Sequence, residues 1–166
     1  LFELLRRCHL VVLAEFAPSD VAAASELILN FDMLRTTLDR APSGNVDKDY
    51  DSIVAFGEVW STLIVSAHLR ASGIVNTWLD ARTVVRTDEH YRSARVDWET
   101  SALRITELMD DLEEGPKRIV TQGFIGFSSE GTTTTLGREG SDFSAAIFAY
   151  LLNAESVTIW KDVPGM

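Results

Sequence analysis

The chain has 166 residues with a formal net charge of −10, and 46% of its residues are hydrophobic. This length suits a single domain with a sizeable core. The negative charge argues against a general nucleic-acid or anionic-membrane surface, because the average field repels phosphates. No apolar stretch approaches the roughly 20 residues that cross a bilayer. Arg6, Arg7 and His9 interrupt the first apolar stretch, which therefore does not resemble a secretory signal.

The single cysteine, Cys8, rules out a disulfide within the chain and suits a reducing cytoplasm, where we expect the protein. Cys8 lies in an apolar helical pattern, which predicts a small core residue rather than a reactive thiol. The histidines His9, His68 and His90 are far apart in the sequence and lack the spacing of metal ligands. We therefore expect structural or surface roles for them and predict no metal site built from side chains.

In chain order, the first half is mainly helical by pattern and the second half mixes helices with strands. Ser19 and Asp20 are typical of a helix N-cap, Gly73 is typical of a helix end, and composition predicts a loop over 41–49. Helices are expected over residues 1–16, about 20–40, 50–71, about 97–114 and 141–154. Strands are expected over 74–80, 117–126 and 156–160, with a polar β-prone region between 80 and 96. The last third reads strand, loop, helix, strand, which is typical of parallel strands in an α/β sandwich.

The stretch TTTTLGREGSDFSAA places glycines, hydroxyls and an arginine directly before a predicted helix. Its glycines allow the backbone to approach a ligand, and Ser141 or Asp142 could cap the helix. The positive end of that helix and the planar guanidinium of Arg138 would together suit a carboxylate or a phosphate. A polar turn with a helix cap and an incidental surface arginine explains the same residues.

Two further stretches have residues suited to binding. Glu58 lies in the apolar helical stretch FGEVWST, on one face with Ser61, where a carboxylate needs a cationic partner unless it points to solvent. Lys161 and Asp162 follow the predicted strand SVTIW, and ligands collect outside the carboxyl ends of such strands. An exposed turn with an ordinary Lys–Asp pair fits equally well. The Asp and Arg residues of WLDARTVVRTD favour structural ion pairing.

Four segments together resemble aspartate kinases of the amino acid kinase family: AFGEVWSTLI, WLDARTVVRTD, VTQGFIG with GTTTTLGREGSDFSAA, and IWKDVPG. The resemblance covers about residues 50–166, and residues 1–49 match loosely as a variable helical region. It implies a three-layer α/β/α sandwich with a mainly parallel sheet, present here incompletely. Residues 1–166 would be part of a single catalytic domain, and the regulatory domains that follow in the family are not in this chain.

The resemblance also implies phosphoryl transfer from ATP to the side-chain carboxylate of L-aspartate, a step toward lysine, threonine and methionine. Glu58 would bind the substrate ammonium, and Asp142 would organise a catalytic lysine and the metal. Lys161 and Asp162 would bind the nucleotide, with Mg²⁺ held through its phosphates, and the family implies a homodimer. The substrate carboxylate would be bound by Arg138, Glu139, Gly140 and Ser141.

The chain departs from the family pattern at several positions. No Lys-Phe-Gly-Gly segment occurs in residues 1–49, so this chain alone is not expected to turn over. Glu139 replaces the first glycine of the usual Gly-Gly, and Lys161 replaces the usual threonine. Two alternatives stay open: the kinase half of a bifunctional aspartokinase–homoserine dehydrogenase, and a non-catalytic module that binds aspartate or nucleotide.

Overall fold

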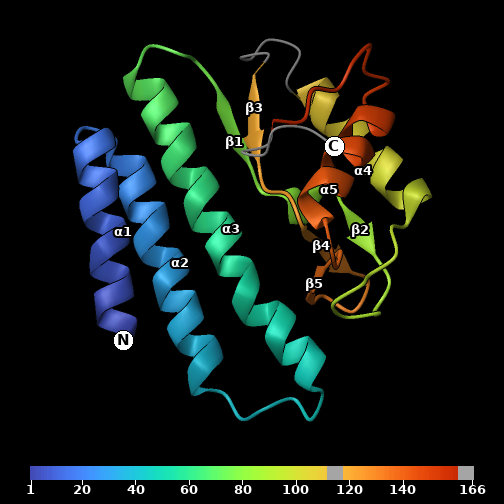
Figure 1. Cartoon of the computed structure of the whole chain (residues 1–166), viewed down its shortest axis with the longest axis horizontal. Helices are drawn as coiled ribbons and strands as arrows, with labels where there is room; N and C mark the ends of the chain where they lie inside the picture. The colour runs from blue at the N-terminus through green and yellow to red at the C-terminus, as the bar shows by residue number, and fades with distance from the viewer. Residues whose placement is uncertain (112–117, 161–166) are drawn as a thin grey trace.

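The computed structural model describes residues 1–111 and 118–160, and its elements are drawn in Figure 1. The helices are α1 Phe2–Phe16, α2 Val21–Asp39, α3 Val46–Ala71, α4 Trp98–Asp111 and α5 Gly140–Leu151. The strands are β1 Thr77–Leu79, β2 Arg86–Thr87, β3 Ile119–Thr121, β4 Ile125–Ser128 and β5 Thr133–Thr135, with a 3₁₀ turn over Ala81–Thr83.

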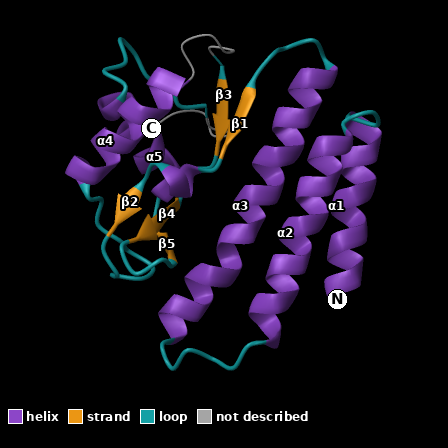
Figure 2. Ribbon diagram, turned by 180° about the vertical axis from the view of Figure 1, so that it is seen from behind, coloured by secondary structure: helices purple, strands orange, loops and turns teal. Residues whose placement is uncertain are grey.

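The elements form three layers, with short strands between two groups of helices. β1 pairs parallel with β3, β2 pairs parallel with β4, and β4 pairs antiparallel with β5. Helices α1, α2 and α3 lie on one side of these strands, and α4 and α5 lie on the other (Figures 1 and 2). The predicted α/β sandwich with mainly parallel pairing is therefore confirmed in an incomplete form.

The largest part of the core lies between α3, the α1–α2 hairpin and the strands. Trp60 of α3 stacks on Phe31 of α2 with ring centroids 4.1 Å apart, and His9 of α1 meets Trp60 edge-on. His9 thus has the structural role that its position predicted. Within the described residues, α3 alone is long and apolar enough to cross a membrane, but it buries Asp51 and packs against helices and strands. That arrangement is typical of the central helix of a folded domain.

The predicted start of α2 is confirmed by a partly buried hydrogen bond. Asp20 caps α2 by accepting a hydrogen bond from the Ala23 N–H at 3.0 Å. The same carboxylate binds the guanidinium of Arg70, near the end of α3, at 2.8 Å. A single acidic side chain therefore caps one helix and ties it to the next.

The predicted loop over 41–49 is too long, because α3 begins at Val46. The Asn45 side chain accepts hydrogen bonds from the N–H groups of Asp47 and Lys48, and this cap adds a first helical turn that the loop-like composition concealed. The other end of α3 agrees with the prediction, since Gly73 follows it with a positive φ of 81°.

The strand predicted over 117–126 is divided, and its first residue, 117, lies outside the described residues. Phe124 has a positive φ of 68°, which turns the chain between β3 and β4. The strand predicted over 156–160 is wrong for the structure. These residues are exposed and pair with no strand among the described residues, and side-chain alternation cannot replace a hydrogen-bonding neighbour.

Three of the four consecutive threonines form a strand, where the sequence had predicted a polar loop. These three make up β5, and all four hydroxyl groups have partners within the domain. The partners are Tyr91 and Ser128 for Thr132, Arg82 for Thr133, Thr87 for Thr134, and Asp51 for Thr135. These hydroxyls hold the β4–β5 hairpin and its neighbours in place.

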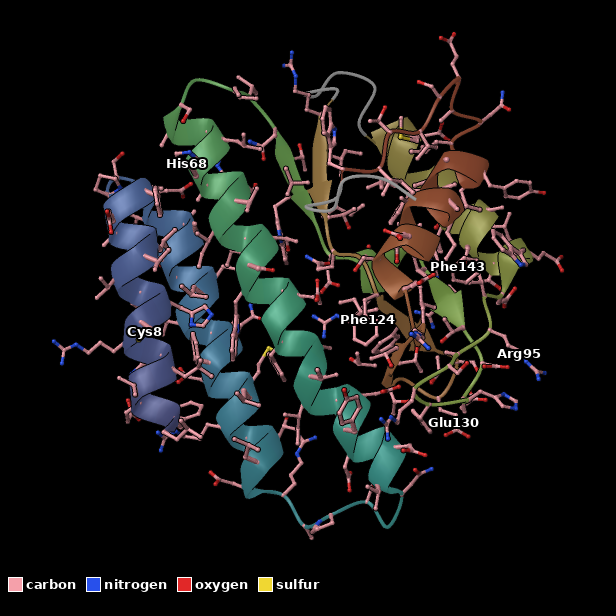
Figure 3. The ribbon with its side chains drawn as sticks, viewed as in Figure 1. Cys8, His68, Arg95, Phe124, Glu130 and Phe143 are labelled. Atoms are coloured by element: carbon pink, nitrogen blue, oxygen red, sulfur yellow. The ribbon has the colours of Figure 1, made fainter. Side chains whose placement is uncertain are left out.

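Cys8 corrects another prediction, because its side chain is exposed on α1 (Figure 3). The apolar pattern of α1 has two faces, and only one packs on the other helices. Leu13 lies on the buried face, whereas Leu4 and Val11 share the exposed face with Cys8.

Candidate functional site

The loop before α5 enters its helix through left-handed backbone conformations. Gly137 has a φ of 80° and Glu139 has a φ of 57°, and the N–H of Gly140 donates to the carbonyl of Gly137. The helix therefore begins at Gly140, with Glu139 at the N-cap and no side-chain cap. The prediction that Ser141 or Asp142 caps this helix is wrong, because both residues already lie in its first turn.

The side chains around this turn differ in exposure. Arg138, Glu139 and Ser141 are exposed, Asp142 is half-buried, and Gly140 is buried. The guanidinium of Arg138 makes no hydrogen bond or ion pair with the described part of the chain. A charged fork beside free helical N–H groups is chemically suited to binding a carboxylate.

A turn between β3 and β4 packs tightly against the start of α5. A Cβ atom on Gly123 would lie 2.9 Å from the Cα of Ser141, so glycine is needed for this approach. The Phe124 N–H donates to Ser144 Oγ at 2.8 Å, and Ser144 Oγ in turn donates to the Gly140 carbonyl. Phe124 itself lies between α3 and the N-terminal end of α5 (Figure 3).

Glu58 projects from the middle of α3 and is half-buried. Burial raises the pKa of its carboxyl above the ordinary value, because removal of water disfavours the charged form. No group in residues 1–111 or 118–160 donates a hydrogen bond to this carboxylate or forms an ion pair with it. A desolvated acid without a partner is a candidate binding group for a cation.

Hydrogen bonds connect the helix of Glu58 to the turn that supports α5. Thr62 lies one turn after Glu58 and donates to the Glu58 carbonyl at 2.9 Å. The fully buried amide of Gln122, directly before Gly123, donates to Thr62 Oγ1 at 2.8 Å. The structure thus joins α3 to the α5 turn through Thr62, Gln122 and Gly123, although no direct contact joins Glu58 to Arg138.

A sequence profile described as the amino acid kinase family matches residues 8–166. The chain belongs to this family. Lysine-sensitive aspartokinase 3 of Escherichia coli is 44% identical over 117 residues, which are 70% of this chain and 26% of that protein. Bifunctional aspartokinase/homoserine dehydrogenase 2 of E. coli is 35% identical over 98% of this chain and 20% of its own length.

Solved structures support the same family. E. coli aspartokinase III in complex with aspartate and ADP superposes with a TM-score of 0.84 and 34% identity, covering 99% of this chain and 36% of that chain. Clostridium acetobutylicum aspartate kinase has the same fold, with a TM-score of 0.72 and 24% identity, and 32% of that chain is covered. The present chain therefore spans about a quarter to a third of the length of these E. coli aspartokinases.

This amino acid kinase domain has a cavity of about 340 Å³ beside the α5 turn, between β3, α4 and α5. Gly123, Ser141 and Ser144 line its polar end, and Leu79, Ile105 and Phe148 are among its apolar walls. Thr121 also lines it, and its buried hydroxyl oxygen has no partner in the described part of the chain. Lys161 and Asp162, the predicted nucleotide contacts, lie outside the described residues.

Other predicted features have structural explanations. Asp80 and Arg82 form an ion pair, with Arg82 Nε 2.9 Å from Asp80 Oδ1, as the WLDARTVVRTD pattern favoured.

Asp51, Thr62 and Gln122 were not predicted as important from the sequence. Asp51 is buried in α3 and accepts three hydrogen bonds, two from backbone N–H groups far along the chain, and no local pattern contains such a partner.

Proposed function

We propose that the complete protein containing this chain is an ATP-dependent aspartate kinase. It would transfer the γ-phosphoryl group of ATP to the side-chain carboxylate of L-aspartate. A carboxylate oxygen forms the new bond to phosphorus while the bond to ADP breaks, giving 4-phospho-L-aspartate and ADP. We place this reaction in the cytoplasm and expect the complete protein to be a homodimer.

One observation carries the proposal: two oppositely charged side chains that have no partner among the described residues occur in an amino acid kinase domain related to aspartokinases. Glu58 is a desolvated carboxylate on α3, and Arg138 is an exposed guanidinium at the start of α5. An α-amino acid carries an ammonium and a carboxylate on one carbon. Glu58 would bind the ammonium and Arg138 the α-carboxylate, leaving the side-chain carboxylate free to react.

The loop around Arg138 would complete the substrate site. The loop and first-turn backbone at Glu139, Gly140 and Ser141 would line the same α-carboxylate. The Gly140 N–H already donates to the Gly137 carbonyl, so the N–H groups of its neighbours, which have no acceptor within the helix, are the ones suited to this contact. Asp142 would organise a lysine and the metal-bound phosphates from the first turn. The rigid packing of Gly123 against Ser141 supports this assignment, because phosphoryl transfer depends mainly on positioning and charge stabilisation.

ATP would bind as the second substrate, with Lys161 and Asp162 as contacts. The cavity beside Ser141 offers apolar walls and the Thr121 hydroxyl, which has no partner in the described structure, a lining compatible with part of a nucleotide. Mg²⁺ bound to the phosphates would neutralise charge on the transferred group. Among the described residues, no cluster of acidic, histidine or cysteine side chains could hold a metal ion.

The proposal is tested with the complete protein by trapping the acyl phosphate with hydroxylamine. We expect hydroxamate formation that requires both L-aspartate and ATP, with stoichiometric release of ADP. Nucleotide or aspartate binding without hydroxamate would support the non-catalytic module instead. Hydroxamate formed equally well with L-glutamate would remove the assigned substrate.

Replacement of Arg138 tests the carboxylate contact separately. Arg138→Ala should raise the KM for aspartate about 100-fold, since a charge-assisted bidentate contact is lost, and leave the KM for ATP unchanged. Arg95→Ala is the matched control, because Arg95 is another exposed arginine, in the loop before α4. An unchanged aspartate KM in Arg138→Ala would remove Arg138 from the site.

A second candidate is the kinase half of a bifunctional aspartokinase–homoserine dehydrogenase. The 35% identity to E. coli aspartokinase/homoserine dehydrogenase 2 over 98% of this chain favours it. The two candidates share the kinase reaction. NADPH-dependent reduction of aspartate semialdehyde by the complete protein would distinguish them.

A further inference from the structure

The hydroxyl of Thr62 uses its full hydrogen-bonding capacity in the centre of the domain. It donates to the Glu58 carbonyl at 2.9 Å, and it accepts from Trp78 Nε1 at 3.1 Å and from Gln122 Nε2 at 2.8 Å. A hydroxyl has one proton and two lone pairs, so these three bonds saturate it, and the Val59 carbonyl at 3.2 Å is a second, longer acceptor for the same proton. Thr62 therefore connects α3, β1 and the residue after β3 at one atom.

Gln122 is fixed at both ends of its amide. Its Oε1 accepts the Ala81 N–H at 2.7 Å while its Nε2 donates to Thr62, and the side chain is 1% exposed. Because the Ala81 N–H requires an oxygen opposite it, these contacts also determine the orientation of the amide. The amide therefore acts as a spacer of constant length between α3 and the β3–β4 turn.

That turn is in direct contact with the start of α5. Gly123 follows Gln122 and lies against Ser141, and the Phe124 N–H is hydrogen-bonded to Ser144. A shift of Gln122 relative to Thr62 therefore moves the first turn of α5 relative to Glu58. No other described hydrogen-bonded chain joins Glu58 to this turn in so few steps.

We propose that Thr62 and Gln122 are positioning residues that set the separation between Glu58 and the Arg138 loop. This inference rests on the proposed function. The ammonium and α-carboxylate of an amino acid are bonded to the same carbon, so two groups that bind them must be held at a constant separation. An error of about 1 Å at such a site can reduce catalysis by on the order of 100-fold.

The closing experiment measures the KM values for aspartate and ATP in the complete protein carrying Thr62→Val. Valine has nearly the shape of threonine but leaves the Gln122 amide and the Trp78 N–H without their acceptor. We expect the aspartate KM to rise about tenfold and the ATP KM to change less than twofold. Thr62→Ser, which keeps the hydroxyl, should restore an aspartate KM close to that of the wild type.

Thr106→Val is the matched control. Thr106 of α4 donates to the carbonyl four residues earlier, as Thr62 does, but it is exposed and accepts no hydrogen bond in the described structure. This variant should keep both KM values. A purely structural defect lowers the fraction of active enzyme and hence the apparent kcat, but it does not change KM.

Succinate provides a second readout because it lacks the ammonium that Glu58 would bind. Its inhibition constant against aspartate should change much less in Thr62→Val than the aspartate KM does. If Thr62→Val does not fold, Gln122→Asn replaces it, since it keeps an amide but shortens the spacer by one carbon. The aspartate KM should again rise about tenfold while the succinate inhibition constant changes much less; succinate is the reference for this variant because Gln122 also lines the cavity assigned to the nucleotide.

Each outcome has a separate meaning. An active Thr62→Val enzyme with an unchanged aspartate KM overturns the positioning role and leaves the kinase proposal intact. Equal rises in the aspartate and ATP KM values also overturn it, because the effect would then not be confined to the Glu58–Arg138 separation. A complete wild-type protein without aspartate-dependent activity overturns the proposed function and this inference together.

Discussion

Two carboxylates on α3, seven residues apart, have opposite surroundings. Asp51 is fully buried and accepts hydrogen bonds from the N–H groups of Arg92 and Thr135 and from the Thr135 hydroxyl. Glu58 is half-buried, and none of the described residues supplies a donor to its carboxylate. Burial alone therefore does not indicate a binding residue. A desolvated acid whose donors are missing is the stronger indication of a ligand.

The largest expected effect comes from removing the Asp51 carboxylate, which accepts three hydrogen bonds within the domain. Asp51→Ala would leave two backbone N–H groups and one hydroxyl without partners, at about 1–3 kcal/mol each, so we expect a loss of about 4 kcal/mol of unfolding free energy. Urea denaturation measures it. Asp47→Ala, which removes an exposed ion pair with Arg92, is the control and should cost less than about 1 kcal/mol. Equal losses in the two variants would contradict the structural role of Asp51.

Replacing Glu58 should have the opposite effect to replacing Asp51, because it should weaken aspartate binding without lowering stability. Glu58→Gln should raise the aspartate KM about 100-fold, or about 2.7 kcal/mol, because the ammonium loses its charged partner. The same change should not lower stability at neutral pH. A loss of stability comparable to that of Asp51→Ala would mean that Glu58 is a structural residue.

The pH dependence of Glu58→Gln follows from the direction of the pKa shift. Burial raises the pKa of Glu58, so its neutral form is compatible with folding and its charged form opposes folding. This penalty is absent below the unfolded pKa of about 4.3 and develops as pH rises through the folded pKa. The gain in stability of Glu58→Gln over wild type should therefore be absent below about pH 4.3 and appear as pH rises above it. A gain largest at low pH would contradict the shift.

The sequence predicted the helices better than the strands because helical periodicity is local. The positions of α1, α2 and α5 and the end of α3 agree with it within a few residues. β5 was missed because consecutive threonines resemble a polar loop, and their partners, such as Asp51 and Thr87, are distant in the chain. Residues 156–160 have a strand pattern but no pairing partner in the described structure.

Sequence patterns indicated the charged residues of the candidate site, but they did not indicate the buried residues that hold these in position. Glu58 and Arg138 belong to motifs that can be read locally, and the structure leaves both without partners among the residues it describes. Gln122 and Thr62 have no such signal, because a hydrogen bond between residues 60 positions apart depends on the packing of α3 against the strands. The positive φ of Glu139 explains why a glycine suits that position in the family pattern.

A smaller effect on stability is expected at Asp20, a carboxylate that has partners but lies nearer to solvent than Asp51. The Ala23 N–H and Arg70 hold the pKa of Asp20 below its ordinary value, the N–H being the larger cause. This stabilisation is present above the unfolded pKa of about 3.9 and is lost as pH falls through the lower folded pKa. Asp20→Asn should cost about 1 kcal/mol at pH 7, because asparagine still caps α2 but cannot pair with Arg70.

Thermal unfolding between pH 2 and 7 measures the contribution of Asp20. The difference between wild type and Asp20→Asn should shrink on acidification and vanish at the lowest pH. Asp32→Asn on the exposed face of α2 is the control and should show no comparable pH dependence. A difference that grows on acidification would contradict the assigned direction.

The smallest effect is expected at Glu139, an exposed acid at the N-cap of α5 whose side chain makes no capping hydrogen bond. Its φ of 57° is strained for a residue with a side chain, so Glu139→Gly should relieve about 1 kcal/mol of strain and lose about half of it to the greater freedom of the unfolded chain. Gly137→Ala should instead lower stability, because a Cβ would lie 2.8 Å from the Arg92 carbonyl oxygen.

Glu139→Gln separates the charge of this residue from its backbone. Its carboxylate lies next to Arg138 in sequence and would repel a bound carboxylate, so neutralisation should lower the aspartate KM about two- to threefold, an effect that salt weakens. A KM that rises instead would mean that the Glu139 carboxylate takes part in binding the ammonium. The negative charge needed by the substrate would then be divided between Glu58 and Glu139, and the 100-fold loss expected for Glu58→Gln should be correspondingly smaller.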